Sequence, residues 1–456
     1  MSQLIKKFSA NNHLIFVGLS ALIFYFFIAL IVSYFPFDGF SYDLIFLPIL
    51  FLYLLYFLSF QFFKTFPLKE AQFKIIFLFS VLFVIFLIFA VPVASTDFYH
   101  YFFEDAALVY HQKNPYLVTP NDLPFEPLTW LAAWHFLPAQ HGPWRIFVTV
   151  PAVFFGAGNF VLTLLFYRIT FGFFVLASIA LFHKILELLE VKEKMLAFLL
   201  FSWNPLIFYG TFFNGGTDIL MVFWLLLSLY FLLRKKYYFS TTFLVISFLT
   251  KYITLIFLPF FLVYLLSQSP GLKGKILTFL KHLFLISALV VGSFLPFWAG
   301  TGIFTGLFFA NRFSDVTSFS GLVSLLFFFF NRGSDFYFFR SLFIYLFQAV
   351  FLIIYGYLLF RFFRLKSLQV KDLIYYNFLT LIWFLVLAYQ WFYPKYLIWL
   401  LPLIFLTKKE FYPLGVFLTG FVVLAAWQVD LMSFYFVVPA AIFGAFYGVK
   451  RMVATP

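Results

Sequence analysis

Acidic and histidine side chains gather in one short stretch of this chain, residues 95–116, which reads STDFYHYFFEDAALVYHQKNPY. Only 10% of the 456 residues are charged, so a local cluster of ionisable groups stands out. The groups in it are Asp97, His100, Glu104, Asp105 and His111. A carboxylate can accept a proton from an attacking hydroxyl, hydrogen-bond to a polar substrate or bind a cation. This stretch is therefore the first candidate for a functional site.

The same residue types are common metal ligands, but their spacing here does not fit a metal motif. The ten residues between His100 and His111 do not match a zinc-ligand spacing, and the chain has no cysteine. We expect no metal site, although a divalent cation held by Glu104 or Asp105 stays open. The sequence has no Walker loop and no G-x-G-x-x-G motif, so it gives no support to a nucleotide-sugar donor.

The elements that must position these groups are membrane helices. Hydrophobic residues make up 64% of the chain and aromatic residues 26%, and apolar runs long enough to cross a bilayer recur from end to end. We predict an all-α polytopic membrane protein with about 12–14 transmembrane helices, forming a single integral-membrane domain over residues 1–456. The predicted helices lie near 13–35, 43–63, 75–94, 160–186, 195–212, 218–234, 238–250, 252–267, 282–299, 341–363, 372–390, 395–407, 411–428 and 432–449.

Basic residues between the apolar runs set the expected topology. The net charge of +13 comes from short Lys/Arg clusters that fit cytoplasmic loops better than a nucleic-acid surface. They place both termini in the cytoplasm and two long segments, 95–145 and 300–340, outside it. Within 95–145, two amphipathic stretches are expected to form short interfacial helices. The apolar runs on either side of Lys251 are short, which predicts a broken or re-entrant pair with this lysine at its tip.

Several motifs together resemble a known family. The pattern T-D-x-x-x-[YF]-x-x-x-D-A-A begins at Thr96, and N-P-Y (114–116) and P-x-E-P-L (124–128) follow it. This series resembles the first luminal loop of the GT-C superfamily of integral-membrane glycosyltransferases. It is most similar to the polyprenyl-phosphate-mannose-dependent mannosyltransferases, which include the catalytic subunit of GPI mannosyltransferase I and bacterial relatives. Tyr99 stands where that family has the second acid of a D-x-D motif.

Looser matches to the same family follow later in the chain. WNPLIFYGTFFNGGTD (203–218) resembles its N-P-L … N-G-H-x-D segment, with Gly216 in place of the histidine. FLTKYITLIFLPFFL resembles a T-K-x-x-P-L-x-x-L-P block, and YQWFYPKYLIWLLPLI resembles a W-Y-x-x-W-x-x-P segment. The resemblance covers most of the chain in order and spacing.

The resemblance implies transfer of a sugar, expected to be mannose, from a polyprenyl phosphate to an extracytoplasmic glycan, lipid or protein by inverting displacement. It places the protein in the bacterial plasma membrane. Because phosphate is a good leaving group, the reaction needs a base and cations rather than a strong acid. Asp97, directly after the apolar run 75–94, is the predicted catalytic base. Predicted substrate-binding residues are Tyr101, Glu104, Asp105, Asn114, Tyr116 and Asp218, and candidates for the donor phosphate are Arg145, Lys251, Arg312 and Lys395.

Structural roles remain open for several of these residues. Asp218 follows an Asn-Gly-Gly turn and fits a helix N-cap, Lys251 and Arg145 fit interfacial anchors, and Arg312 fits an ion pair with nearby Asp315. Alternative functions are a flippase or transporter of lipid-linked sugars, an O-antigen polymerase or ligase, and a membrane subunit without activity. A transporter predicts internal repeats and ionisable residues at mid-membrane, whereas the charges expected here lie at the outer face.

Overall fold

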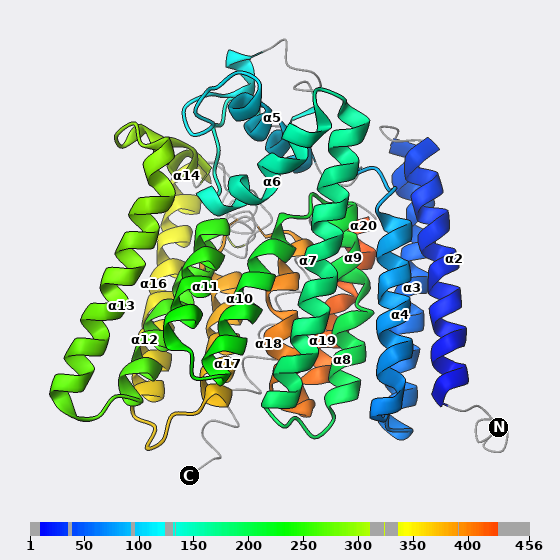
Figure 1. The fold of residues 1–456 in the computed structure, drawn as a ribbon. Coiled ribbons are helices and arrows are strands. Elements are labelled where there is room, and N and C mark those ends of the chain that lie inside the picture. The colour runs from blue at the N-terminus through cyan, green and yellow to red at the C-terminus, as the bar shows by residue number, and fades with distance from the viewer. Residues whose placement is uncertain are drawn as a thin grey trace.

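The computed structural model describes residues 10–34, 39–92, 96–123, 131–132, 134–310, 323, 336–390 and 392–426, to which all structural statements refer. These residues form helices and contain no β-strand (Figure 1). Eight described helices are long and apolar enough to cross a membrane, and five shorter apolar helices of 10–17 residues accompany them. The predicted all-α polytopic fold is therefore confirmed.

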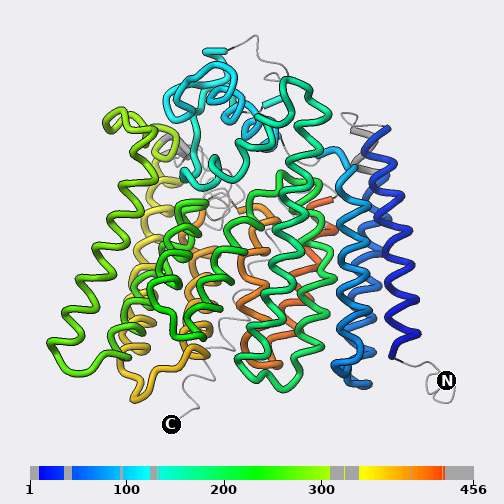
Figure 2. Tube along the Cα trace, viewed as in Figure 1, coloured from blue at the N-terminus to red at the C-terminus, as the bar shows by residue number. Residues whose placement is uncertain are grey.

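The long helices lie side by side, and Figures 1 and 2 show α5, α6 and their connecting loop as a layer above one end of them. The helices named below have these bounds: α2 Ala10–Tyr34, α3 Gly39–Thr65, α4 Phe73–Leu87, α5 Asp97–Val109, α6 Pro143–Gly156, α7 Phe160–Leu188, α8 Lys194–Ser202, α9 Pro205–Phe212, α10 Thr217–Leu233, α11 Tyr237–Thr250, α12 Leu258–Ser267, α13 Gly271–Phe294, α14 Thr305–Ala310, α16 Phe336–Phe363, α17 Val370–Trp383, α18 Leu401–Leu406, α19 Tyr412–Thr419 and α20 Phe421–Ala426.

Short helices in the middle of the bundle make room for a site below the layer of α5 and α6. At 1.5 Å per residue, the 14 residues of α11 extend about 21 Å, less than the roughly 30 Å of a hydrocarbon core. Lys251 follows in an extended conformation, with φ −148°, before the 3-10 helix η4 (Tyr252–Phe257) turns into α12. The predicted break at Lys251 is therefore present, and it brings a chain reversal beneath α5 and α6.

Several predicted boundaries are wrong for identifiable reasons. The helix expected to start near 282 starts at Gly271. The lysines that were assigned to a loop lie on the exposed face of α13. A lysine can pack its apolar side-chain stem against such a face and keep its charge in water. The run 195–212 divides into α8 and α9 at Asn204 and Pro205. The run 372–390 ends in a π-helical turn, Phe384–Ala388. A second interfacial helix was expected in 95–145, but residues 134–137 of that stretch form a turn. The helix expected at 432–449 lies outside the described residues.

Asn204 ties the break between α8 and α9 to the rest of the bundle. Its side-chain amide donates to Tyr56 of α3 at 3.1 Å and to Thr419 of α19 at 2.7 Å. Its Oδ1 accepts from the backbone N–H of Leu206 at 3.0 Å and so caps α9. Because Asn204 is fully buried, water cannot replace these bonds once they are lost.

We predict that Asn204→Ala destabilises the protein by about 2–3 kcal/mol, because it removes a cap and leaves buried polar groups with fewer partners. Thermal unfolding in detergent micelles, followed by tryptophan fluorescence, measures the effect. Asn159→Ala is the matched control, since Asn159 caps α7 through a single bond to Leu162 at an exposed position. Equal shifts in Tm for the two variants would contradict the proposed role of Asn204 as a tertiary tie.

Candidate active site

The ends of four helical elements meet beneath α5 and α6, and each end supplies one charged side chain. Asp97 is the first residue of α5, and Asp218 lies in the first turn of α10. Lys251 follows the last residue of α11, and Lys395 lies at the start of the 3-10 helix η8 (Pro394–Trp399). The helix dipole favours a carboxylate at an N-terminus and an ammonium at a C-terminus, which suits the positions of Asp97, Asp218 and Lys251.

These four residues form two ion pairs, which we call the paired-ion cluster. The Nζ of Lys395 lies 2.6 Å from Oδ2 of Asp97, and the Nζ of Lys251 lies 2.6 Å from Oδ1 of Asp218. Two indoles add hydrogen bonds to the carboxylates. Trp399 Nε1 donates to Asp218 at 2.5 Å, and Trp134 Nε1 donates to Asp97 at 3.4 Å.

Aromatic rings of η8 connect the two ion pairs. The ring centre of Tyr396 lies 4.5 Å from the Nζ of Lys251 and 5.6 Å from the Nζ of Lys395. Trp399 stacks on Tyr396 at 4.5 Å and also lies 4.8 Å from the Nζ of Lys251. Ring faces attract cations at these distances. The Tyr396 ring thus lies close to both ammonium groups.

Two glycines set the start of α10. Gly215 and Gly216 have positive φ values, 95° and 79°, which L side chains rarely adopt. A Cβ atom at Gly216 would also lie 2.5 Å from the Phe171 ring. Glycine is therefore required where the family motif has histidine. The N-cap of α10 is Gly216, and the Asp218 carboxylate contacts Lys251 and Trp399 instead. The interpretation of Asp218 as an N-cap is wrong.

Exposure distinguishes Asp97 within the cluster. The side chain of Asp97 is 26% exposed, whereas those of Lys395, Lys251 and Asp218 are 5%, 11% and 3% exposed. Asp97 is therefore the charged group that an incoming molecule meets first. Burial of Lys251 in an ion pair also argues against its being an anchor that reaches into bulk water.

Electrostatics keep Asp97 ionised. Burial favours the neutral acid, but the ammonium of Lys395 at hydrogen-bond distance and the more distant Lys251 outweigh it and hold the pKa of Asp97 below its usual value. Burial and the nearby Lys251 lower the pKa of His141 to about 3, so its imidazole is neutral. The buried Nδ1 of His141 has no hydrogen-bond partner among the described residues.

Glu104, Asp105 and Arg145 belong to a second, fully buried cluster that holds α5 in place. Arg145 of α6 forms ion pairs with Glu104 and Asp105 of α5. The hydroxyl of Tyr167 in α7 donates to Asp105, and His100 lies 3.1 Å from Glu104. Arg145 is not an interfacial anchor, because it has no exposed surface. Its ion pairs also occupy the guanidinium, which favours a positioning role over contact with a phosphate.

The remaining predicted residues lie in three different surroundings. The Tyr101 ring lies 5.1 Å from that of His141 and 5.4 Å from the Arg145 guanidinium, so it stands between the two clusters. Asn114 donates to the carbonyl of Phe297, and the hydroxyl of Tyr116 donates to the carbonyl of His141. These last two residues fix the loop rather than face the paired-ion cluster. Arg312 lies outside the described residues.

Sequence reasoning missed the tryptophans of the site. Trp399 follows Lys395 by one helical turn, and this spacing in PKYLIW was the available signal that both belong to one face. Trp134 gave no such signal, because its contact with Asp97 depends on how the loop 110–142 folds back.

Comparison with known proteins gives one match. The MptA_B family model, described as "Alpha-(1->6)-mannopyranosyltransferase, N-terminal domain", matches residues 40–267, which is half of the chain. The matched part contains Asp97, Asp218 and Lys251. No curated protein and no solved structure matched the chain. The chain belongs to the MptA_B family of alpha-(1->6)-mannopyranosyltransferases and is a mannosyltransferase embedded in the membrane.

Proposed function

We propose that this protein transfers mannose from a polyprenyl-phosphate donor to an extracytoplasmic acceptor, forming an α-(1→6) linkage with Asp97 as the base. The observation that carries the proposal is a part-exposed, ionised carboxylate in direct contact with a buried ammonium, beside a second such pair. A base and two cations are what this reaction requires. The match to the mannopyranosyltransferase family supports the sugar and the linkage.

The proposed step is a single displacement. The acceptor's C6 hydroxyl attacks C1 of the donor mannose, and the C1–O bond to phosphate breaks as the new C1–O bond forms. Asp97 takes the hydroxyl proton, and the polyprenyl phosphate leaves with the bonding electron pair. Because one displacement inverts C1, an α product requires a β-linked donor. General-base catalysis by Asp97 contributes about 10²–10⁴-fold to the rate.

The lysines have to change partners for this step to occur. In the structure Lys395 neutralises Asp97 at 2.6 Å, which makes the carboxylate a weak base. The donor phosphodiester carries one negative charge and gains a second as the C1–O bond breaks, so its attraction for this ammonium increases toward the transition state. When Lys395 turns to the phosphate, burial raises the pKa of Asp97 and strengthens it as a base. Lys251 reaches the same phosphate from its contact with Asp218.

Charge distribution supports an extracytoplasmic site. The basic turn Arg234–Lys235–Lys236 joins α10 to α11, and it lies at the end of the bundle away from α5 and α6 (Figures 1 and 2). The turn between α7 and α8, which contains Lys192, lies at that same end (Figure 1). Basic turns favour the cytoplasm, so the layer of α5 and α6 would face the outside of the plasma membrane. Residues 95–145 then carry the site together with Asp218, Lys251 and Lys395.

We predict that Asp97→Asn lowers kcat by about 10²–10⁴-fold without loss of the folded protein, because the amide cannot accept the proton. The assay uses membrane vesicles, labelled polyprenyl-phosphate mannose and an oligomannoside acceptor. Asp122→Asn is the control, since Asp122 is in the same loop and the side-chain bonds that the described residues give it go to nearby Thr119. Activity of Asp97→Asn close to that of the wild type would remove Asp97 from the mechanism. Movement of the intact labelled donor across the membrane without transfer would favour a flippase.

We predict that Lys395→Gln raises KM for the donor by about tenfold or more, because a charge-assisted contact to phosphate is lost. In the plot of kcat/KM against pH, the same change moves the fall in activity on the acidic side to higher pH. Activity is lost as pH falls through the pKa of Asp97, and this pKa rises when Lys395 no longer opposes the effect of burial.

Rates measured between pH 3 and 8 test this second prediction, and Lys409→Gln is the control. Lys409 also forms an ion pair at 2.5 Å, with Glu193, but on the exposed surface. A Lys395→Gln profile that coincides with the wild-type profile would show that Lys395 does not control the ionisation of Asp97.

A further inference from the structure

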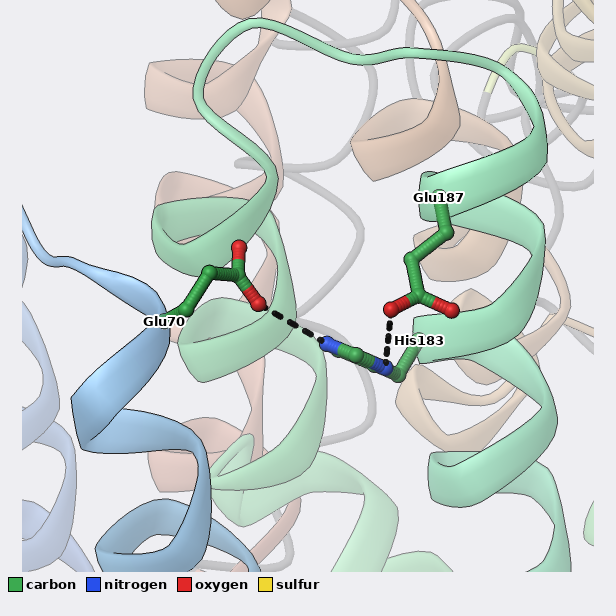
Figure 3. Close-up of side chains that lie close together, drawn as sticks. All are labelled: Glu70, His183 and Glu187. Atoms are coloured by element: carbon green, nitrogen blue, oxygen red, sulfur yellow. Dashed lines mark ion pairs between the residues drawn. The ribbon is translucent and has the colours of Figure 1, made fainter.

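Three side chains of metal-ligating type converge at the end of the bundle opposite α5 and α6. Glu70 lies in the short 3-10 helix η1 (Glu70–Gln72) that precedes α4, and His183 and Glu187 lie near the end of α7 (Figure 3). His183 and Glu187 are four residues apart and therefore share one face of the helix. One ligand atom from each of the three residues lies within 4.8 Å of the others.

The imidazole of His183 stands between the two carboxylates. Its Nε2 lies 3.8 Å from Oε2 of Glu70, and its Nδ1 lies 3.7 Å from Oε1 of Glu187. Rings of Phe73 and Phe198 contact the imidazole at 4.4 Å and 5.0 Å. Packing from both rings fixes the direction in which the nitrogens point. The histidine is thus oriented before any ligand arrives.

A second observation points to a ligand. His183 is only 6% exposed, and its Nε2 has no hydrogen-bond partner among the described residues. A buried polar atom without a partner is costly to fold. The unpartnered nitrogen faces the carboxylate of Glu70 (Figure 3), and a cation between them would satisfy both groups.

We propose that Glu70, His183 and Glu187 bind a divalent transition-metal ion of the Zn²⁺ class. One imidazole and two carboxylates are a ligand set that Zn²⁺ accepts, with water in a fourth position. Zinc lies about 2.0–2.2 Å from such ligands, so two donors around one ion lie at most about 4.4 Å apart. The three ligand atoms lie within 4.8 Å of one another, and a small rotation of the partly exposed glutamate side chains closes the remaining gap.

Two lysines compete with the ion and make the site exchangeable. Lys194 lies 2.9 Å from Glu70, and Lys184 lies 3.2 Å from Glu187. Exposed ion pairs of this kind contribute little to stability, so a divalent ion displaces them. The positive charge of the two lysines nevertheless lowers the affinity of the site for a divalent ion, compared with a site whose carboxylates have no lysine partner. The site therefore fits an ion that binds reversibly, with an occupancy that follows the concentration of the free ion.

The bound ion would join the start of α4 to the end of α7. The opposite end of α7 carries Tyr167, whose hydroxyl donates to Asp105 of α5. One helix thus connects the proposed ion to the cluster that holds α5 beside the site. This inference does not depend on the proposed transfer reaction, because binding is measured without any sugar substrate.

The test uses the full chain in detergent, purified through a tag without histidine and stripped with a chelator. Zn²⁺ titration by calorimetry is expected to give one ion per chain, and Tm is expected to rise by several degrees because the ion binds the folded state. Co²⁺ should give visible absorption bands of a nitrogen- and oxygen-ligated ion. Glu70→Gln/Glu187→Gln should abolish all three signals, and its changes lie at exposed positions that tolerate substitution.

The matched control is His13→Gln. His13 lies in α2 and stacks on Phe62 at 4.0 Å, and no carboxylate contact to it is present among the described residues. The control should bind Zn²⁺ like the wild type. Absence of saturable binding to the wild type would overturn the proposal. Undiminished binding to the Glu70→Gln/Glu187→Gln variant would also overturn it, by placing the ion elsewhere.

Discussion

The structure depends on pairing the acidic and basic side chains that the helices bring together near α5 and α6, away from bulk water. Isolated ions in apolar surroundings are very costly, whereas a well-placed partner removes most of that cost. The chain meets this constraint with Asp97–Lys395 and Asp218–Lys251, each at 2.6 Å. Asp97 and Lys395 are 298 residues apart in sequence, so correct assembly of the whole bundle is required before the charges are paired. The groups to which the proposed mechanism assigns the chemistry therefore meet only in the assembled bundle.

Helix length explains where these charges lie. Regular membrane helices would carry the chain past the middle of the bilayer without interruption, but α9, α10 and α11 stop short of the layer formed by α5 and α6. Each stop has a local cause. Glycines with positive φ lie between the end of α9 and the start of α10, and Lys251 leaves the helical conformation after α11. Helix ends also leave backbone N–H and C=O groups unpaired and expose the helix dipole. The irregular backbone therefore lies where the charged groups of the candidate site meet.

Much of this arrangement could be predicted from the sequence. The rest could not, and the reasons can be stated in physical terms. Apolar periodicity identified most helices, and motif order selected Asp97, Asp218, Lys251 and Lys395, which the structure brings together. The sequence could not show which acid meets which base, since these are tertiary contacts. Arg145 was accordingly grouped with the phosphate candidates, although its partners are Glu104 and Asp105. The boundaries of α8, α9 and α13 also differed from the predicted ones, because apolar content alone does not show where a helix starts or breaks.

The contact between Lys395 and Asp97 has a consequence for the timing of the reaction. Water is small and abundant, and a free carboxylate beside a lipid-linked sugar would activate it as readily as an acceptor alcohol. With the ammonium in place, the resting enzyme has no strong base to offer to either molecule. In the proposed mechanism the arriving phosphate draws the ammonium away, so reactivity begins after the sugar is bound. An enzyme built in this way restrains wasteful hydrolysis by keeping its carboxylate engaged until it is needed.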